Sequence, residues 1–352
     1  MTQTPPAPPM NRRERALRAV ELRRPDRCPI VHSILPAAFL THGKALVDLL
    51  SKYPNDFGSS EHSIPKIEDL SPDYKAGRNA DSWGTVWEST TNGIHGQVAD
   101  YPIHTWEQAE EYQFPPLPGD EDIAKRRTSV AEAKKDLLVM NGFNPGNYFE
   151  RLQWLLGFRT VLTCLVRQPP QFVRFADRLL EYCLQSIGRT LEARPDGVSF
   201  GDDWGAQDRL LIKPEIWRSF FKPRYKRMFD LVHDSGAFVQ LHSDGYIVDI
   251  LDDLHEIGVD ILNPQFSCHD LDDFAERTRG RFCINSDVDR QGVLPHASAR
   301  EMASHIRYLV RIFGQDNEGG LFGRGELNMD VPLDNVKAMF DSFVRYGKYK
   351  WR

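Results

Sequence analysis

The sequence has only five cysteines, and their spacing argues against two common scaffolds. Five is an odd number and no Cys-x-x-Cys pair occurs, which disfavours a disulfide framework and a zinc ribbon. The sequence also has no apolar run long enough to cross a membrane, and residues 1–10 contain no apolar segment typical of a secretory signal. These absences predict a reduced, cytoplasmic protein that does not enter a membrane.

Two nucleotide-binding motifs and a nucleic-acid-binding pattern are also missing. No Gly-x-Gly-x-x-Gly or Gly-x-x-x-x-Gly-Lys-Ser/Thr sequence follows an apolar run. The net charge is −6, and no dense stripe of Lys and Arg interleaves with aromatic residues. The sequence therefore supports neither a dinucleotide-binding fold nor a P-loop, and it argues against nucleic-acid binding.

Short apolar runs alternate with helical patterns along much of the chain. Runs that are continuously apolar are typical of parallel strands, which are buried on both faces. From about residue 160 they recur every 20–40 residues or so, an interval that accommodates one helix, as repeated βα units require. The expected strands are residues 28–34, 136–143, 196–203, 237–244, 259–265, 281–287 and 319–325.

This alternation predicts an α/β fold. A single closed (β/α)8 TIM barrel fits a chain of 352 residues better than an open sheet does. The Pro-rich residues 1–10 are predicted to be a disordered tail, and residues 11–352 are predicted to form the barrel domain. Residues 54–126, rich in Gly, Pro, Asp and aromatic residues, are expected to form an extended loop excursion from the N-terminal part of the barrel.

Polar side chains cluster where the predicted strands end. In a TIM barrel these ends converge on one mouth, where the chemistry takes place. The sequence therefore predicts a polar ring around a shared opening. Its members are Asp202, Asp203, His242, Asp244, Asn263, Gln265, Cys268, Asp287, Asp289, Arg324 and Glu326.

The segment FGDDWGAQ, residues 200–207, allows two interpretations. Asp202 or Asp203 can act as a general acid or base, with Trp204 and Gln207 contacting a substrate. Alternatively, one aspartate caps the following helix and Trp204 is a packing residue. We predict the first, because the segment lies at a strand end.

The segment LHSDG, residues 241–245, is the sharpest signal. His242 can bind a metal or shuttle protons, and Asp244 can bind the same metal or orient the imidazole. The alternative is a structural histidine, with Asp244 capping the next helix and Gly245 easing the turn. We predict a catalytic and metal-binding role for His242.

The last strand and a nearby cysteine add candidates. Arg324 suits an anionic ligand, and Glu326 suits a metal or a proton, although the two can equally form a structural ion pair. Cys268 is a soft metal-ligand candidate, although a free cysteine is more often simply buried.

Two earlier segments supply further substrate-binding candidates. In DSWGTVWE, residues 81–88, Asp81, Trp83 and Trp87 either line the pocket or belong to an aromatic core plug. Asn144 and Glu150 lie at an expected loop-to-helix junction, where a capping role and a ligand contact are both open. Asn144 is taken as substrate-binding.

Several segments, in this order along the chain, resemble the uroporphyrinogen decarboxylase superfamily, and the resemblance spans nearly the whole chain after the tail. They are NRRERALRAVELRRPDRCPI, DGVSFGDDWGAQ, KPEIWRSFFKPRYKRMFDLVHDSGAFVQLHSDG, EIGVDILNPQ, DVDRQGVLP and DVPLDNVKAMF. The resemblance implies a TIM barrel. Members are either porphyrin decarboxylases or methyltransferases that work with a corrinoid protein.

The resemblance favours the methyltransferase branch. The decarboxylases carry an early Arg-Gln-Ala-Gly-Arg run that grips the substrate's carboxylates, whereas here the matching segment reads HSILPAAFLTHG and has no arginine. DDWGAQ and DSWGTVWE look more like the methyltransferases. The corrinoid would then be supplied in trans by a partner protein.

The resemblance also changes the expected metal chemistry. Thiol-methylating members hold zinc with a His-x-Cys pair and a late cysteine. His242 matches their histidine, whereas Asp244 matches the first cysteine and Arg324 lies near the second. Histidine with carboxylates makes a harder site, which suits zinc or another divalent metal that polarises a methoxylated or methylated donor. The metal ligands predicted are His242, Asp244, Glu326 and Cys268.

Three functions remain open on sequence grounds. The first is transfer of a methyl group from a small methoxylated or methylated donor to a corrinoid protein. The chain is also a candidate for a homodimer. The second is a decarboxylase or other lyase of a small carboxylated substrate, not uroporphyrinogen. The third is a non-catalytic binding barrel, which is disfavoured because a buried polar ring is costly without a ligand.

Overall fold

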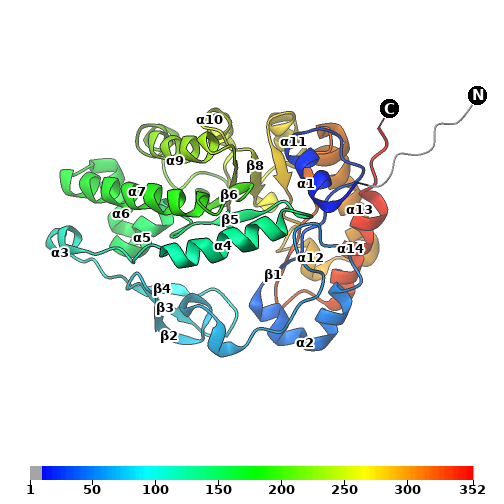
Figure 1. The fold of residues 1–352 in the computed structure, drawn as a ribbon, viewed down its shortest axis with the longest axis horizontal. Helices are drawn as coiled ribbons and strands as arrows, with labels where there is room; N and C mark the ends of the chain where they lie inside the picture. The colour runs from blue at the N-terminus through cyan, green and yellow to red at the C-terminus, as the bar shows by residue number, and fades with distance from the viewer. Residues whose placement is uncertain (1–9, 352) are drawn as a thin grey trace, which may run out of the picture.

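The computed structural model describes residues 10–351 and shows an α/β TIM barrel (Figure 1). Six parallel strands form one sheet in the order β10-β9-β8-β7-β6-β5. Their bounds are β5 Met140–Gly142, β6 Gly197–Gly201, β7 Phe238–Ser243, β8 Ile261–Pro264, β9 Cys283–Asn285 and β10 Leu321–Phe322. Residues 1–9 of the predicted tail lie outside the described residues.

The first and last strands extend this sheet. Ile30 pairs in parallel with Gly323, just after β10, and β1 (Ser33–Ile34) pairs in parallel with β11 (Glu326–Leu327). The predicted first strand therefore forms beside the last one, as barrel closure requires. Between residues 10 and 351, no ladder joins β1 to β5.

Helices fill the connections between strands, as the sequence predicts. Their bounds are α1 Arg12–Val20, α2 Pro36–Leu50, α3 Trp106–Glu111, α4 Asp120–Ala133, α5 Phe149–Leu156, α6 Phe158–Arg167, α7 Pro170–Leu191, α8 Pro214–Ile216, α9 Lys222–Asp234, α10 Leu251–Glu256, α11 Leu271–Thr278, α12 Val293–His296, α13 Ala299–Leu309 and α14 Leu333–Tyr346. None of these helices has the length and apolar content that a membrane crossing requires.

Helix α13 illustrates how the sequence specifies these elements. Ser298 and Glu301 form a reciprocal capping box, which satisfies backbone donors at the helix start. Met302, Ile306 and Leu309 are all buried, and their spacing of four and three residues places them on one face. That face packs into the main core of the molecule.

The excursion is more ordered than its composition predicts. It contains an antiparallel sheet of β2 (Gly77–Ala80), β3 (Val86–Ser89) and β4 (Gln97–Asp100), drawn below the barrel sheet in Figure 1. Trp87 of this sheet is buried and lies edge-on to Trp154 of α5. The excursion is stabilised by docking on α5, a tertiary contact that its own sequence does not reveal.

The loops after β6 and β7 approach each other closely. Gly205 donates a backbone hydrogen bond to Asp244, and Tyr246 donates one to Ala206. Gly245 has a φ of 77°, and a Cβ added to it would lie 2.1 Å from the carbonyl oxygen of Gly205. Only glycine therefore fits at residue 245, for both conformational and steric reasons.

We predict that Gly245→Ala destabilises the protein much more than Gly236→Ala. Gly236 has a similar φ of 78°, but a Cβ added there would meet nothing within 4 Å, so this variant measures the conformational cost alone. We expect about 1 kcal/mol for Gly236→Ala and at least about 2 kcal/mol more for Gly245→Ala. Urea unfolding of both variants measures this, and equal losses would show that the loop contact is unimportant.

Candidate active site

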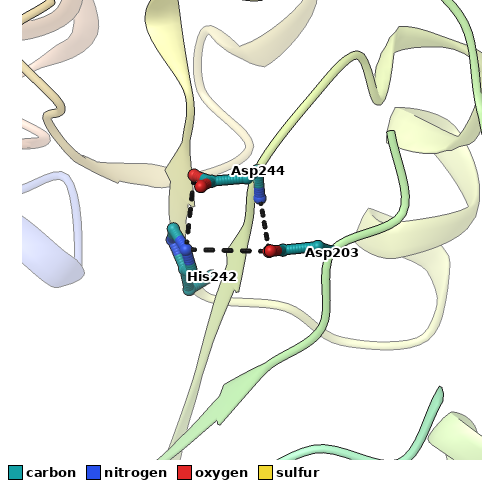
Figure 2. Close-up of side chains that lie close together, drawn as sticks. All are labelled: Asp203, His242 and Asp244. Carbon is teal, nitrogen blue, oxygen red and sulfur yellow. Dashed lines mark hydrogen bonds and ion pairs between the residues drawn. The ribbon is translucent and has the colours of Figure 1, made fainter. Parts of the chain in front are cut away.

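Asp203, His242 and Asp244 converge at the C-terminal ends of β6 and β7 (Figure 2). The Nε2 atom of His242 lies 3.4 Å from Oδ1 of Asp244 and 3.8 Å from Oδ1 of Asp203. The backbone N–H of Asp244 donates to Oδ1 of Asp203 at 2.9 Å, which ties the two loops together. We call this group the Asp-His-Asp cluster.

The environment of His242 determines its tautomer. Its Nδ1 lies 2.9 Å from the side-chain oxygen of Asn263 and 3.1 Å from the carbonyl oxygen of the same residue. The amide nitrogen of Asn263 donates to the carbonyl of Asn285 at 2.6 Å, so its oxygen is the atom that faces the histidine. Both neighbours accept, so Nδ1 carries the proton. An imidazole protonated at Nδ1 alone presents the lone pair of Nε2 to the space between the two carboxylates.

This arrangement fits the requirements of a divalent metal ion. Zinc binds nitrogen and oxygen ligands at about 2.0–2.1 Å, which places tetrahedral ligand atoms about 3.3–3.4 Å apart. The two separations from His242 Nε2, 3.4 and 3.8 Å, are close to that value and too long for good hydrogen bonds. Metal-binding histidines also typically donate their other N–H to a carbonyl or carboxylate, as His242 does to Asn263.

The electrostatic environment of Asp203 also favours a bound cation. Burial raises the pKa of the Asp203 carboxyl, and the charge of Asp244 raises it further, while His242 has the opposite effect. The carboxylate is therefore held in an environment that penalises its charge. A cation between the three side chains would remove this penalty.

A second charged group lies beside the cluster. Arg290 forms ion pairs with Asp244 at 2.5 Å, with Glu326 at 3.1 Å and with Asp287 at 3.2 Å. Arg324 pairs with Glu326 at 2.7 Å and lies 3.6 Å from Asp287. Glu326 is thus engaged by two guanidinium groups, and Asp287 is almost fully buried between them.

The predicted metal ligands are only partly brought together. His242 and Asp244 are in the cluster, but their third partner is Asp203 rather than Glu326 or Cys268. Glu326 is occupied by its two arginines. Cys268 is 8% exposed, and its sulfur lies 3.5 Å from the side-chain oxygen of Gln207. The structural ion pair considered for Arg324 and Glu326 is present.

Asp202 has several structural partners. It is buried, and its carboxylate accepts backbone N–H groups of Tyr148, Phe149 and Glu150 at 2.7–2.9 Å, and the hydroxyl of Tyr225. Burial raises its pKa to about 6, although these donors oppose the rise. The carboxylate therefore holds the start of α5, and the catalytic role of Asp202 stays a prediction.

Trp204 and the excursion residues also have structural partners. Trp204 is fully buried and stacks on Phe149, with ring centroids 4.5 Å apart. Asp81 accepts hydrogen bonds from two backbone groups and from Trp87. Trp83 donates its indole N–H to Asn144 at 3.1 Å. Trp204 thus packs as its alternative interpretation requires, and the buried Trp83 fits the core-plug alternative. Substrate contact stays a prediction for Asp81, Trp83, Asn144, Trp204 and Gln207.

Glu150 is the residue that the sequence left undecided and the structure brings to the site. It lies in the first turn of α5, and its carboxyl accepts one hydrogen bond, from Asn147 at 3.3 Å. Burial, together with the charges of Asp203 and Asp202, raises its pKa to about 9. Glu150 is therefore protonated at neutral pH in the metal-free protein. Its first-turn position was readable from the sequence, but its acidic neighbours were not.

Comparisons with known proteins agree with this architecture. The model of the uroporphyrinogen decarboxylase (URO-D) family matches residues 152–346. A methyltransferase from Methanosarcina mazei superposes with a TM-score of 0.64 at 14% identity, covering 96% of this chain and 99% of that one. Dispersin B aligns over 91% and 99% with a TM-score of 0.39 at 12% identity. The likeness to the methyltransferase, at 14% identity, shows the fold alone, and nothing is inferred from Dispersin B. No curated protein matches the sequence.

We predict that Glu150→Gln stabilises the metal-free protein, and more so at pH 8 than at pH 5. Folding raises the pKa of Glu150 to about 9. The folded state therefore retains a proton that the unfolded state loses above about pH 4.3, and stability falls as the pH rises between the two values. Glutamine keeps the shape and has no such dependence.

Urea unfolding at both pH values, with chelator present, measures this effect. Glu132→Gln, on the exposed side of α4, is the matched control and should give the same difference from wild type at both pH values. A Glu150→Gln effect independent of pH would show that the carboxyl is ionised in the folded protein.

Proposed function

The chain belongs to the uroporphyrinogen decarboxylase family, and we propose that it is a methyltransferase of this family. In this proposal it moves a methyl group from a small methoxylated or methylated donor to a corrinoid carried by a partner protein, with a divalent metal on Asp203, His242 and Asp244. The observation that carries the proposal is the orientation of His242, whose Nε2 lone pair faces two carboxylates at ligand-like distances.

The donor set favours activation of an ether or a similar group over activation of a thiol. Two carboxylates and one imidazole make a hard site, whereas thiol activation favours thiolate ligands. A bound metal of this kind would act as a Lewis acid on the leaving group of the donor. Asn263 would orient the imidazole, and Arg290 would hold Asp244 in place through its 2.5 Å ion pair.

The charge balance of the mouth disfavours a substrate with many carboxylates. Arg290 and Arg324 are the two guanidinium groups described at these strand ends, and both are paired with Asp287 and Glu326. Binding a polyanion requires cations that are free to pair with it. A small neutral or cationic methyl donor does not need free cations in the site.

Metal binding tests the site directly. We expect about one zinc ion per wild-type chain after dialysis with zinc, and a 10–100-fold or larger loss of affinity in Asp203→Asn, His242→Ala or Asp244→Asn. Asp208→Asn lies on the same loop as Asp203 but is exposed, so it should bind zinc as the wild type does. Zinc titration with a competing chromophoric chelator measures these affinities. Normal affinity in all three cluster variants would disprove the site.

Activity tests the reaction. With a reduced corrinoid protein and a panel of methoxylated arenes and methylated amines, we expect methylated corrinoid, seen by its absorption change, and the demethylated product. Chelation and His242→Ala should each reduce the rate by at least about 100-fold. Release of carbon dioxide from a small acid, without corrinoid and unaffected by chelator, would instead identify a lyase.

A further inference from the structure

A large open cavity lies at the end of the barrel opposite the proposed active site. Its volume is about 1120 Å³. One wall is α13 with the short helical turns Val310–Gly314 and Gln315–Asn317, which lead into the start of β10, and the other is the segment after α14. The lining residues are Ser304, Arg307, Tyr308, Val310, Arg311, Gln315, Asp316, Tyr346, Lys348, Tyr349, Lys350 and Trp351.

The cavity is strongly basic although the protein is acidic overall. Four basic side chains line it, Arg307, Arg311, Lys348 and Lys350, against one acidic side chain, Asp316. Arg307 and Arg311 are one helical turn apart, so they lie on the same side of the helix. Among residues 10–351, none of these four cations forms an ion pair, in contrast to the exposed pairs elsewhere on the surface. These four charges are therefore available to pair with an anion from outside the protein.

Aromatic rings supply the second feature of the cavity. Tyr308, Tyr346, Tyr349 and Trp351 all line it, and the rings of Tyr349 and Trp351 lie 4.9 Å apart. Trp351 is fixed by an indole hydrogen bond of 2.7 Å to the carbonyl of Pro25. Tyr349 is buried, and one face of each other ring already carries a guanidinium group, from Arg24, Arg311 or Arg345. A planar ring of a ligand would therefore stack on the opposite face of Tyr308, Tyr346 or Trp351.

The walls of the cavity are held by defined contacts. Gln315 and Lys350 exchange two hydrogen bonds, of 3.1 and 3.3 Å, across the cavity. A Cβ added at Gly314 would lie 2.4 Å from the hydroxyl of Tyr349, so this glycine lets the two walls meet. A site whose walls are fixed in advance loses little conformational entropy when a ligand binds.

We propose that this cavity binds a planar organic polyanion of the nucleoside polyphosphate class. Four cations match two or more phosphate charges, and the aromatic faces match a purine or similar ring. The volume, about 1120 Å³, lies just above the usual range for small-molecule sites, about 300–1,000 Å³. The site is distinct from the Asp-His-Asp cluster, because it lies at the N-terminal end of the strands.

Calorimetry at low salt, with EDTA to remove metals, tests the proposal with three probes: ATP, inorganic tripolyphosphate and adenosine. We expect ATP to bind, tripolyphosphate to bind at least about tenfold more weakly, and adenosine more weakly still. ATP binding should weaken as salt is raised. No ATP binding at about 1 mM, or equal binding of ATP and tripolyphosphate, would overturn it.

Variants locate the binding. Arg307→Gln/Arg311→Gln should weaken ATP binding by about tenfold or more, because both charges are removed from exposed positions without disturbing the core. The matched control is Arg126→Gln/Arg127→Gln on the exposed face of α4, which should bind ATP normally, as should His242→Ala. Normal binding in the Arg307/Arg311 variant would place ATP elsewhere and refute the proposal, whatever the methyl transfer assays show.

Discussion

The buried carboxylate of Asp202 is the interaction that organises the rest of the site. It joins three elements that are far apart in the chain: its own strand β6, the start of α5 through three backbone N–H groups, and α9 through Tyr225. Because Asp203 follows it directly, this anchor fixes where the next carboxylate can point. It also places Glu150, whose N–H it binds, beside the same opening.

Negative charge is concentrated at the mouth and is only partly neutralised by the protein itself. Arg290 and Arg324 pair with Asp287 and Glu326, and Arg290 also reaches Asp244. Asp203 has the imidazole of His242 at 3.8 Å and does not pair with Arg290 or Arg324. An environment of this kind stabilises added positive charge, which is the physical basis for the proposed metal and for a donor that is not a polyanion. The opposite end of the barrel has the reverse polarity, with four cations around one cavity.

The outcome for single residues shows where sequence reasoning reached its limit. The alternation of apolar runs located β5 to β10, and the position of polar residues after them located the mouth, because parallel strands end together. The same reasoning could not separate Asp202 from Asp203. The two carboxylates point in opposite directions from adjacent residues, one into the start of α5 and one toward His242. Cys268 and Glu326 lie outside the Asp-His-Asp cluster and have other partners. Cys268 contacts Gln207 and Glu326 pairs with Arg290, and both partners come from other loops.

Local periodicity was enough to predict the barrel strands, and the resemblance of several segments indicated the family. The segment LHSDG by itself supplied His242 and Asp244 as neighbours. Which side chains share a space depended instead on how the strands and loops pack. Packing set the tautomer of His242 through Asn263 and gathered a basic cavity within an acidic chain. It raised the pKa of Glu150 through burial and through the charges of Asp203 and Asp202, about fifty residues away. Each of these effects depends on the distance between groups in space. Residues far apart in the sequence can therefore act on one another as soon as the fold brings them together.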